Sequence, residues 1–94
     1  MIYRLRYGQQ FQRQLKSLPG HVRSAARRLL ESLTAEPRPP QAKELDNHPN
    51  HYRIWLLGDH RLVYQVMEEQ QIIYLLYIGP KIPDLYARLG LGRN

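Results

Sequence analysis

The stretch Tyr52–Val66 constrains the fold more than any other part of this chain. It alternates apolar and polar side chains on both sides of Gly58-Asp59, which is the pattern of two β-strands joined by a tight turn. Each strand carries an arginine, Arg53 or Arg61. An arginine on a strand of a small sheet costs free energy unless an anion or an acidic side chain meets it. We therefore expect the hairpin to form part of a binding site as well as part of the sheet.

The length of the turn decides whether the two arginines share a face of the sheet, because side chains alternate between the two faces of a strand. A strict two-residue loop pairs Arg53 with Tyr64 and leaves the arginines on opposite faces. One more loop residue pairs Arg53 with Val63 and Trp55 with Arg61, which places both arginines on one face. We expect the longer loop, because the strict loop buries one arginine without a visible partner.

Apolar spacing and turn signals divide the rest of the chain into short segments. The expected elements are strands at Ile2–Tyr7, Tyr52–Leu57, His60–Met67 and Gln71–Gly79, helices at Phe11–Leu18, Val22–Leu33 and Pro83–Leu89, and a short extended piece near Ala42–Leu45. We therefore predict one α+β domain over residues 1–94. Two helices pack on a small, mostly antiparallel sheet in the order β-α-α-β-β-β, followed by a short C-terminal helix.

The charge of the chain narrows the classes of partner. The formal net charge is +6 and the pI is about 10.0, so nucleic acid is the first partner to consider. A docking surface for an acidic protein and an ordinary solvated surface are the alternatives. The chain has no cysteine, which fits a reducing compartment, and shows no secretory signal or membrane-spanning run. We expect a cytoplasmic protein that does not contact a membrane.

Three cations form the candidate phosphate site. Arg53, Arg61 and Lys81 come from two strands and from the end of the next, and arginine binds phosphate oxygens with two parallel hydrogen bonds. Trp55 and Tyr86 lie beside them in sequence and are candidates for stacking on RNA bases. The competing interpretations are a half-buried strand residue for Trp55 and packing of the C-terminal helix for Tyr86.

The other polar residues carry weaker signals. His48 and His51 have a spacing found in some metal sites, but no third ligand accompanies them, so we expect neither a metal nor a cofactor. His60 is interpreted first as a turn residue, although it could act near neutral pH. Glu44 and Asp46 are the only acids expected near the basic face, and both are interpreted as loop surface.

Four short motifs give the chain a family resemblance. They are Lys43-Glu44-Leu45, Tyr52-Arg53-Ile54, the run Arg61–Val66 and the strand end Ile78-Gly79. With them, the whole chain resembles the RelE/ParE superfamily of small bacterial toxins from type II toxin–antitoxin systems. The run Arg61–Val66 is more similar to the RelE branch than to the gyrase-poisoning ParE branch.

The resemblance implies a metal-independent endoribonuclease that cuts messenger RNA on the ribosome. By that resemblance, Arg61 holds the scissile phosphate, Arg53 matches a basic strand position, Lys81 assists the leaving group and Tyr86 stacks on a base. Contacts to RNA are then expected from Arg53, Trp55, Arg61, Lys43 and His60. The resemblance also implies a cognate antitoxin, acidic where it crosses this surface, through which the complex binds operator DNA.

Two departures from the family pattern bear on activity. Trp55 stands where related enzymes often carry a second basic residue proposed as the general base. Pro80-Lys81 stands where related enzymes often have a Gly-Lys pair followed by an arginine. Arg53 is a poor base because a guanidinium group does not give up its proton in proteins. His51, His60 and Lys81 are the candidates for the base, together with the ribosome and water. A non-enzymatic gyrase inhibitor and a decayed toxin remain the alternative functions.

Overall fold

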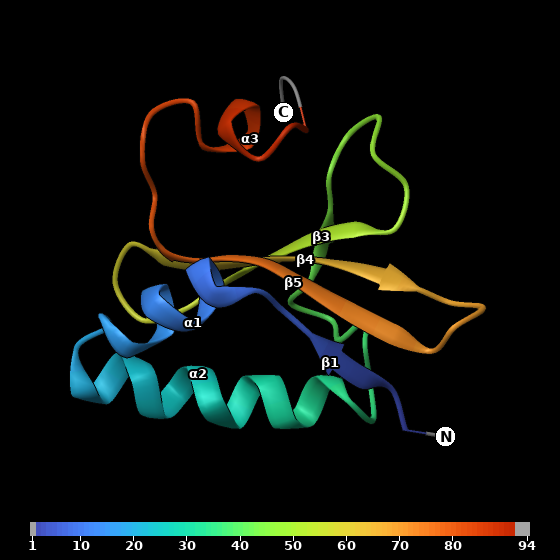
Figure 1. Cartoon of the computed structure of the whole chain (residues 1–94), viewed down its shortest axis with the longest axis horizontal. Helices are drawn as coiled ribbons and strands as arrows, with labels where there is room; N and C mark the ends of the chain where they lie inside the picture. The colour runs from blue at the N-terminus through green and yellow to red at the C-terminus, as the bar shows by residue number, and fades with distance from the viewer. Residues whose placement is uncertain (1, 92–94) are drawn as a thin grey trace.

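The computed structural model describes residues 2–91 and contains one sheet with two helices on one face and a short helix on the other (Figure 1). The elements are β1 (Arg4–Arg6), α1 (Gln9–Lys16), α2 (Gly20–Leu33), β2 (Lys43–Glu44), β3 (His51–Trp55), β4 (His60–Met67), β5 (Ile72–Pro80) and α3 (Leu85–Arg88). The strands lie in the order β1-β5-β4-β3-β2, and only β1 and β5 run parallel. The predicted α+β fold is confirmed, with the extended piece near residue 43 forming a fifth strand.

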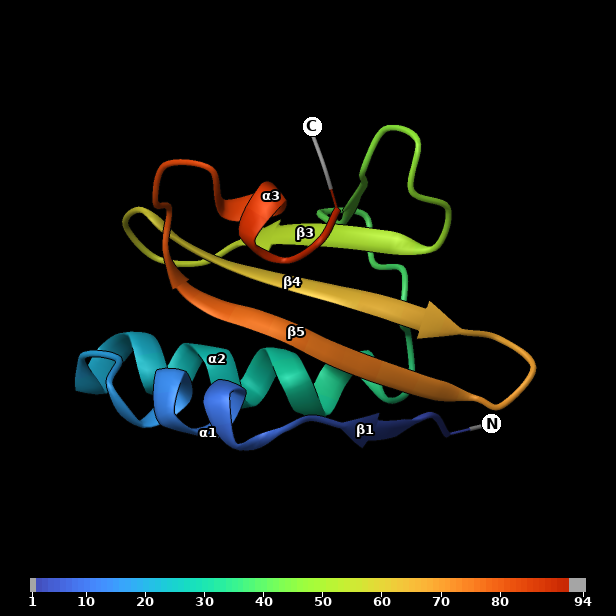
Figure 2. The ribbon, with the colours of Figure 1, turned by 45° about the horizontal axis from the view of Figure 1, so that its top comes forward.

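The helices α1 and α2 build the core on what we call the inner face of the sheet (Figure 2). Apolar residues at helical spacing on both helices point at alternate residues of the strands, as expected for an amphipathic helix on a sheet. The guanidinium of Arg23 ties the helices together by donating to the carbonyls of Lys16 (3.0 Å) and Leu18 (3.3 Å). The main members of this core are Phe11, Val22, Ala26, Leu30, Leu33, Ile54, Leu62, Tyr64, Ile73 and Ile78.

The hairpin β3–β4 has the longer of the two possible loops. Arg53 pairs with Val63, and Trp55 pairs with Arg61, as predicted. Gly58 has a φ of +66°, a conformation that glycine adopts without the steric cost of a side chain. Both arginines therefore lie on the face opposite α1 and α2, which we call the outer face. Within residues 2–91, no helix is long and apolar enough to cross a membrane.

A second, smaller apolar cluster lies on the outer face beneath α3. It joins Leu85 and Leu91 of the C-terminal segment to Val63 and Tyr77 of the sheet, with Leu45 from the β2–β3 connection. A register shift between β4 and β5 accompanies it, because Val63 pairs with Tyr77 while its neighbour Tyr64 pairs with Leu75. The cluster fixes α3 and the preceding segment above one end of the sheet (Figure 2).

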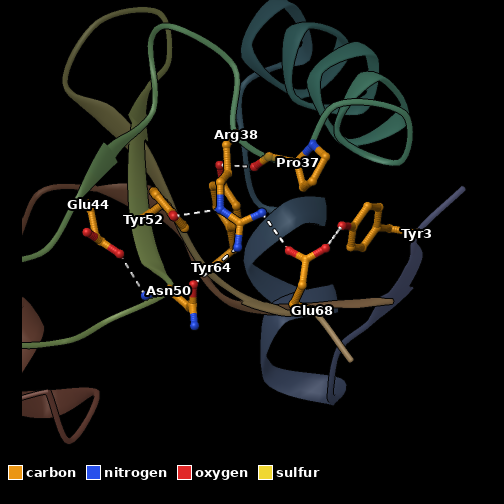
Figure 3. Close-up of polar contacts among 8 residues, drawn as sticks. All are labelled: Tyr3, Pro37, Arg38, Glu44, Asn50, Tyr52, Tyr64 and Glu68. Carbon is orange, nitrogen blue, oxygen red and sulfur yellow. Dashed lines mark hydrogen bonds and ion pairs between the residues drawn. The ribbon is translucent and has the colours of Figure 1, made fainter. Parts of the chain in front are cut away.

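A polar network fastens the long connection after α2 to the far end of the sheet (Figure 3). Arg38 donates to Tyr52 Oη (2.7 Å), Glu68 Oε1 (2.7 Å) and Asn50 Oδ1 (3.1 Å), and the Tyr3 hydroxyl donates to Glu68. Burial opposes the charge of Arg38, but its bonds to Glu68 and Tyr52 outweigh burial and raise its pKa. The bonds from Tyr3 and then Arg38 lower the pKa of Glu68.

Candidate phosphate-binding groove

An open groove of about 910 Å³ lies between the outer face of the sheet and the segment that contains α3. A cavity of this size falls in the range that holds small ligands. Its lining includes the three cations of the predicted clamp, the two predicted stacking residues and one further predicted RNA contact: Arg53, Arg61, Lys81, Trp55, Tyr86 and Lys43. Residues from β2, β3, β4 and the C-terminal segment therefore meet at one place.

Arg61 lies at the base of this groove and is almost fully buried, with 3% of its surface exposed. Its Nη1 donates to Tyr86 Oη at 2.7 Å, and its guanidinium carbon lies 4.1 Å from the centre of the Trp55 ring. The Nε atom is buried without a hydrogen-bond partner. Among residues 2–91 the one ion pair joins Arg38 to Glu68, so no carboxylate neutralises Arg61. The groove therefore holds a buried cation whose hydrogen-bonding capacity is partly unused.

Two further cations extend the positive charge along the wall formed by β2 and β3. Lys43 and Arg53 are directly opposite each other in the antiparallel pair β2–β3, an arrangement that like charges make unfavourable. Arg53 also lies 5.8 Å from the centre of the Trp55 ring. An anion between these cations would relieve their repulsion, so the charge of this wall favours a phosphate contact.

The end of β5 positions Lys81 on the other side of the groove. The Lys81 N–H donates to the Asp59 carbonyl at 3.0 Å, which holds the chain beside the β3–β4 turn. Gly79 has a φ of +154°, and a Cβ there would lie 3.0 Å from Tyr77 Oη. That hydroxyl donates to the Pro80 carbonyl at 2.5 Å. Burial raises the pKa of Tyr77, which keeps the hydroxyl neutral in spite of nearby Arg61.

Three carboxylates also line the groove, more than the sequence pattern indicated. The sequence predicts loop surface for Glu44 and Asp46, whereas Glu44 lies on β2, and it gives no signal at Asp84. Glu44 Oε2 accepts the Asn50 N–H at 2.9 Å, so it also closes the β2–β3 connection. Asp84 has a left-handed conformation, with φ at 57°, just before α3. No local signal marked Asp84, because its position depends on how the C-terminal segment folds back over the sheet.

The histidines lie elsewhere. His60 follows the turn on the inner face, in a smaller groove beside α1, and its Nδ1 donates to the Leu57 carbonyl (2.9 Å). His51 lies on the outer face two residues before Arg53, and its Nδ1 donates to the Pro49 carbonyl (3.0 Å). Of the residues that the structure describes, no histidine lines the groove of Arg61, and no group of three could hold a metal.

Comparisons with known proteins agree with one another. The sequence model of the ParE toxin of the type II toxin–antitoxin system parDE matches residues 5–81. The isolated RelE toxin of E. coli is 26% identical, with a TM-score of 0.74 over 92% of this chain and 93% of that chain.

Two complexes are equally similar in sequence. The toxin in the intact E. coli RelBE complex is 26% identical, with a TM-score of 0.74 over 85% of this chain and 98% of its own. The archaeal RelE–RelB complex from Pyrococcus horikoshii OT3 gives 26% identity and a TM-score of 0.72 over 100% of both chains. No curated protein sequence matches the chain. The chain therefore belongs to the ParE toxin family of type II toxin–antitoxin systems, within the RelE/ParE superfamily.

Proposed function

We propose that this toxin is a metal-independent endoribonuclease that cuts messenger RNA on the ribosome. The observation that carries the proposal is the convergence of Arg53, Arg61, Lys81 and Tyr86 on one groove. Phosphoryl transfer needs stabilised negative charge and positioned proton donors more than it needs a covalent protein nucleophile. A groove with cations on three sides and aromatic rings between them supplies the first of these requirements.

In the proposed reaction the RNA 2′-hydroxyl attacks the adjacent phosphate. The bond from phosphorus to the 2′-oxygen forms, the bond to the 5′-oxygen breaks, and the products carry a cyclic phosphate and a free 5′-hydroxyl. Arg61 and Arg53 stabilise the additional negative charge of the transition state. Lys81 protonates the departing 5′-oxygen, and Tyr86 and Trp55 stack on the flanking bases.

The proton of the attacking hydroxyl needs a separate acceptor. Neither His51 nor His60 lines the groove, which leaves groove carboxylates, water and the ribosome as acceptors. Trp55 replaces a cation at the position where related enzymes often carry one. We therefore propose that this chain cleaves slowly by itself and depends on the ribosome for part of the proton transfer.

A cognate antitoxin is the proposed protein partner. RelE has been solved with RelB from E. coli and from Pyrococcus horikoshii, and this chain shares the toxin fold of both complexes. A net charge of +6 favours an antitoxin segment that is acidic where it crosses the groove. We propose further that the complex binds operator DNA through the antitoxin, and that the toxin acts in the cytoplasm.

Mapping of messenger RNA ends after brief induction tests the proposed cleavage. Cleaved ends should accumulate within translated regions for the wild type and should disappear with Arg61→Ala. The charge-matched control is Arg27→Gln, which removes an exposed cation from α2, on the far side of the sheet. Ends that are equally abundant with Arg61→Ala would show that the groove does not cut RNA.

Inhibition of DNA gyrase is the second candidate. It is favoured by the match to the ParE family and by the absence of a histidine from the described groove. In this case the groove binds a protein and performs no chemistry. Purified gyrase should then stop supercoiling plasmid DNA when the toxin is added, and unchanged supercoiling at excess toxin removes this candidate.

A further inference from the structure

The outer face of the sheet continues well beyond the groove, and its charge is one-sided. The strands β1, β3, β4 and β5 contain no acidic residue, whereas Arg4, Arg6, Arg53 and Arg61 all lie on them. Arg53 and Arg61 belong to the groove already described. Arg4 and Arg6 lie on β1, at the opposite edge of the sheet, and both are exposed.

A row of four side chains crosses the outer face between these two regions. Arg6 on β1 pairs with Tyr74 on β5, Tyr74 pairs with Gln65 on β4, and Gln65 pairs with His51 on β3. Their neighbours along each strand belong to the inner core, so these four point outward. Three steps between strands at about 4.8 Å each give the row a length of about 14 Å.

The row is accessible and polar. Tyr74 is 42% exposed although it lies on an interior strand. In Figure 2, α3 lies above the end of β3 at its arrowhead. His51 is the first residue of β3, so the row crosses the sheet towards the opposite end. His51 donates from Nδ1 to the Pro49 carbonyl, so its Nε2 remains available as an acceptor when the ring is neutral. The row therefore offers a stacking ring, an amide that can both donate and accept, and a cation.

The row is also continuous with the groove. His51 precedes Arg53 by two residues on the same face of β3, which separates their backbone positions by about 7 Å. Within the described residues β3, β4 and β5 contain no carboxylate, and the one strand carboxylate near this path is Glu44 on β2, opposite Tyr52. A single RNA strand that extends from Arg53 across the sheet can therefore contact the exposed ring of Tyr74 and the positive charge of Arg6.

We propose that the row Arg6, Tyr74, Gln65 and His51 is a second contact for single-stranded RNA, which positions the strand that leaves the groove. Tyr74 stacks on a base, Gln65 hydrogen-bonds to its edge and Arg6 binds a phosphate. This inference rests on the proposed action on RNA. With the row, the bound RNA extends across the sheet as far as the edge strand β1. The groove alone would bind only the nucleotides next to the scissile bond.

Fluorescence anisotropy with a labelled, fully 2′-O-methylated RNA strand tests the row, because this RNA lacks the attacking hydroxyl and stays intact. Tyr74→Ser should weaken binding at least about fivefold, since stacking on an aromatic ring contributes substantially per base. Tyr74→Phe keeps the ring and should bind like the wild type. Arg6→Gln should reduce the slope of log K against log salt by about 0.7, the value for one phosphate contact on a single strand. The matched control Arg27→Gln should leave both quantities unchanged.

The outcomes separate this inference from the function on which it rests. If the wild type does not bind the RNA at all, the row is overturned, whereas the proposed cleavage on the ribosome stands or falls by the mapping of messenger RNA ends. If Arg61→Ala weakens binding while Tyr74→Ser does not, the row is overturned and the groove stands. If Tyr74→Ser weakens only the complex with the antitoxin, the row is a protein-docking surface and the inference is wrong. A dinucleotide, too short to reach the row from the groove, should bind equally to wild type and Tyr74→Ser.

Discussion

Replacing Arg61 by methionine separates what this side chain costs in folding from what it contributes to binding. Arg61 has only 3% of its surface exposed, and its guanidinium has no carboxylate partner among residues 2–91. Methionine has a similar length and flexible stem, so it keeps the apolar contacts and removes the charge. We expect Arg61→Met to fold more stably than the wild type and to lose activity.

The magnitude follows from the contacts of the guanidinium. The bond to Tyr86 Oη contributes about 1.5–3 kcal/mol as a hydrogen bond from a charged group. The Trp55 ring at 4.1 Å adds about 0.5–2 kcal/mol. Against these stand several kcal/mol, on the order of 5, for removing the ion from water, including about 1–3 kcal/mol for the unpartnered Nε. We expect Arg61→Met to raise the free energy of unfolding by about 1–2 kcal/mol. Each kcal/mol raises Tm by roughly 4–8 °C in a domain of this size.

Urea unfolding of the two purified proteins, followed by far-UV circular dichroism, measures this gain. Tyr86→Phe provides an internal check, because it removes the hydroxyl that accepts from Arg61. It should destabilise the wild type by about 1.5–3 kcal/mol and have almost no effect in the Arg61→Met background. If Arg61→Met is less stable than the wild type by more than about 1 kcal/mol, the buried cation is structurally satisfied and the reasoning fails.

Three other changes test separate parts of the structure. Lys81→Gln should reduce cleavage by roughly 10²-fold or more while RNA affinity falls less than about tenfold, measured by single-turnover cleavage on ribosomes. Gly79→Ala should lower the free energy of unfolding by about 1–3 kcal/mol, because φ is +154° and the new Cβ meets Tyr77 Oη at 3.0 Å; adding Tyr77→Phe should recover part of the loss. Glu68 has a lowered pKa, so the stability it contributes is present above its ordinary pKa near 4.5 and is lost as pH falls through the lower folded value. Glu68→Gln should remove this acid dependence in thermal unfolding as the pH falls below about 4.5, and an unchanged profile would exclude the Tyr3 and Arg38 bonds as its cause.

The hairpin shows how far the sequence could lead. Its register was predictable because only the longer loop gives β3 and β4 one apolar face, and the pairing of Trp55 with Arg61 confirms this. The spacing of the apolar residues also predicts which side of each helix faces the sheet, because buried positions recur with the helical period in a helix and at every second residue in a strand. The burial of Arg61 was less accessible to prediction. It depends on Trp55 and Tyr86, which approach from another strand and from a segment 25 residues away.

The pairing of β2 and the position of Asp84 depend on long-range packing. The sequence predicts only a short extended piece near Ala42–Leu45, because two residues are too few for any alternation of polarity; this piece becomes the strand β2 because Lys43 and Glu44 pair with β3. Asp84 reaches the groove only because Leu85 and Leu91 pack on Val63 and Tyr77 beneath them. The pairing of β2 and the position of Asp84 are both set by the tertiary structure, and no local sequence pattern encodes them.

The cover over Arg61 distinguishes the two candidate functions on physical grounds. A partner that contacts the guanidinium must replace the Tyr86 hydroxyl or enter beside the Trp55 ring, which is 52% exposed. A phosphate accepts two parallel hydrogen bonds from arginine, a stronger arrangement than one bond to a neutral hydroxyl. The bases on either side of that phosphate can stack on the rings that the phosphate displaces. A protein surface can offer a carboxylate and an aromatic side chain, but a nucleic-acid strand places a planar base on either side of every phosphate, which matches a cation flanked by Trp55 and Tyr86. The buried position of Arg61 therefore favours a nucleic-acid strand over a protein surface as the ligand of this groove.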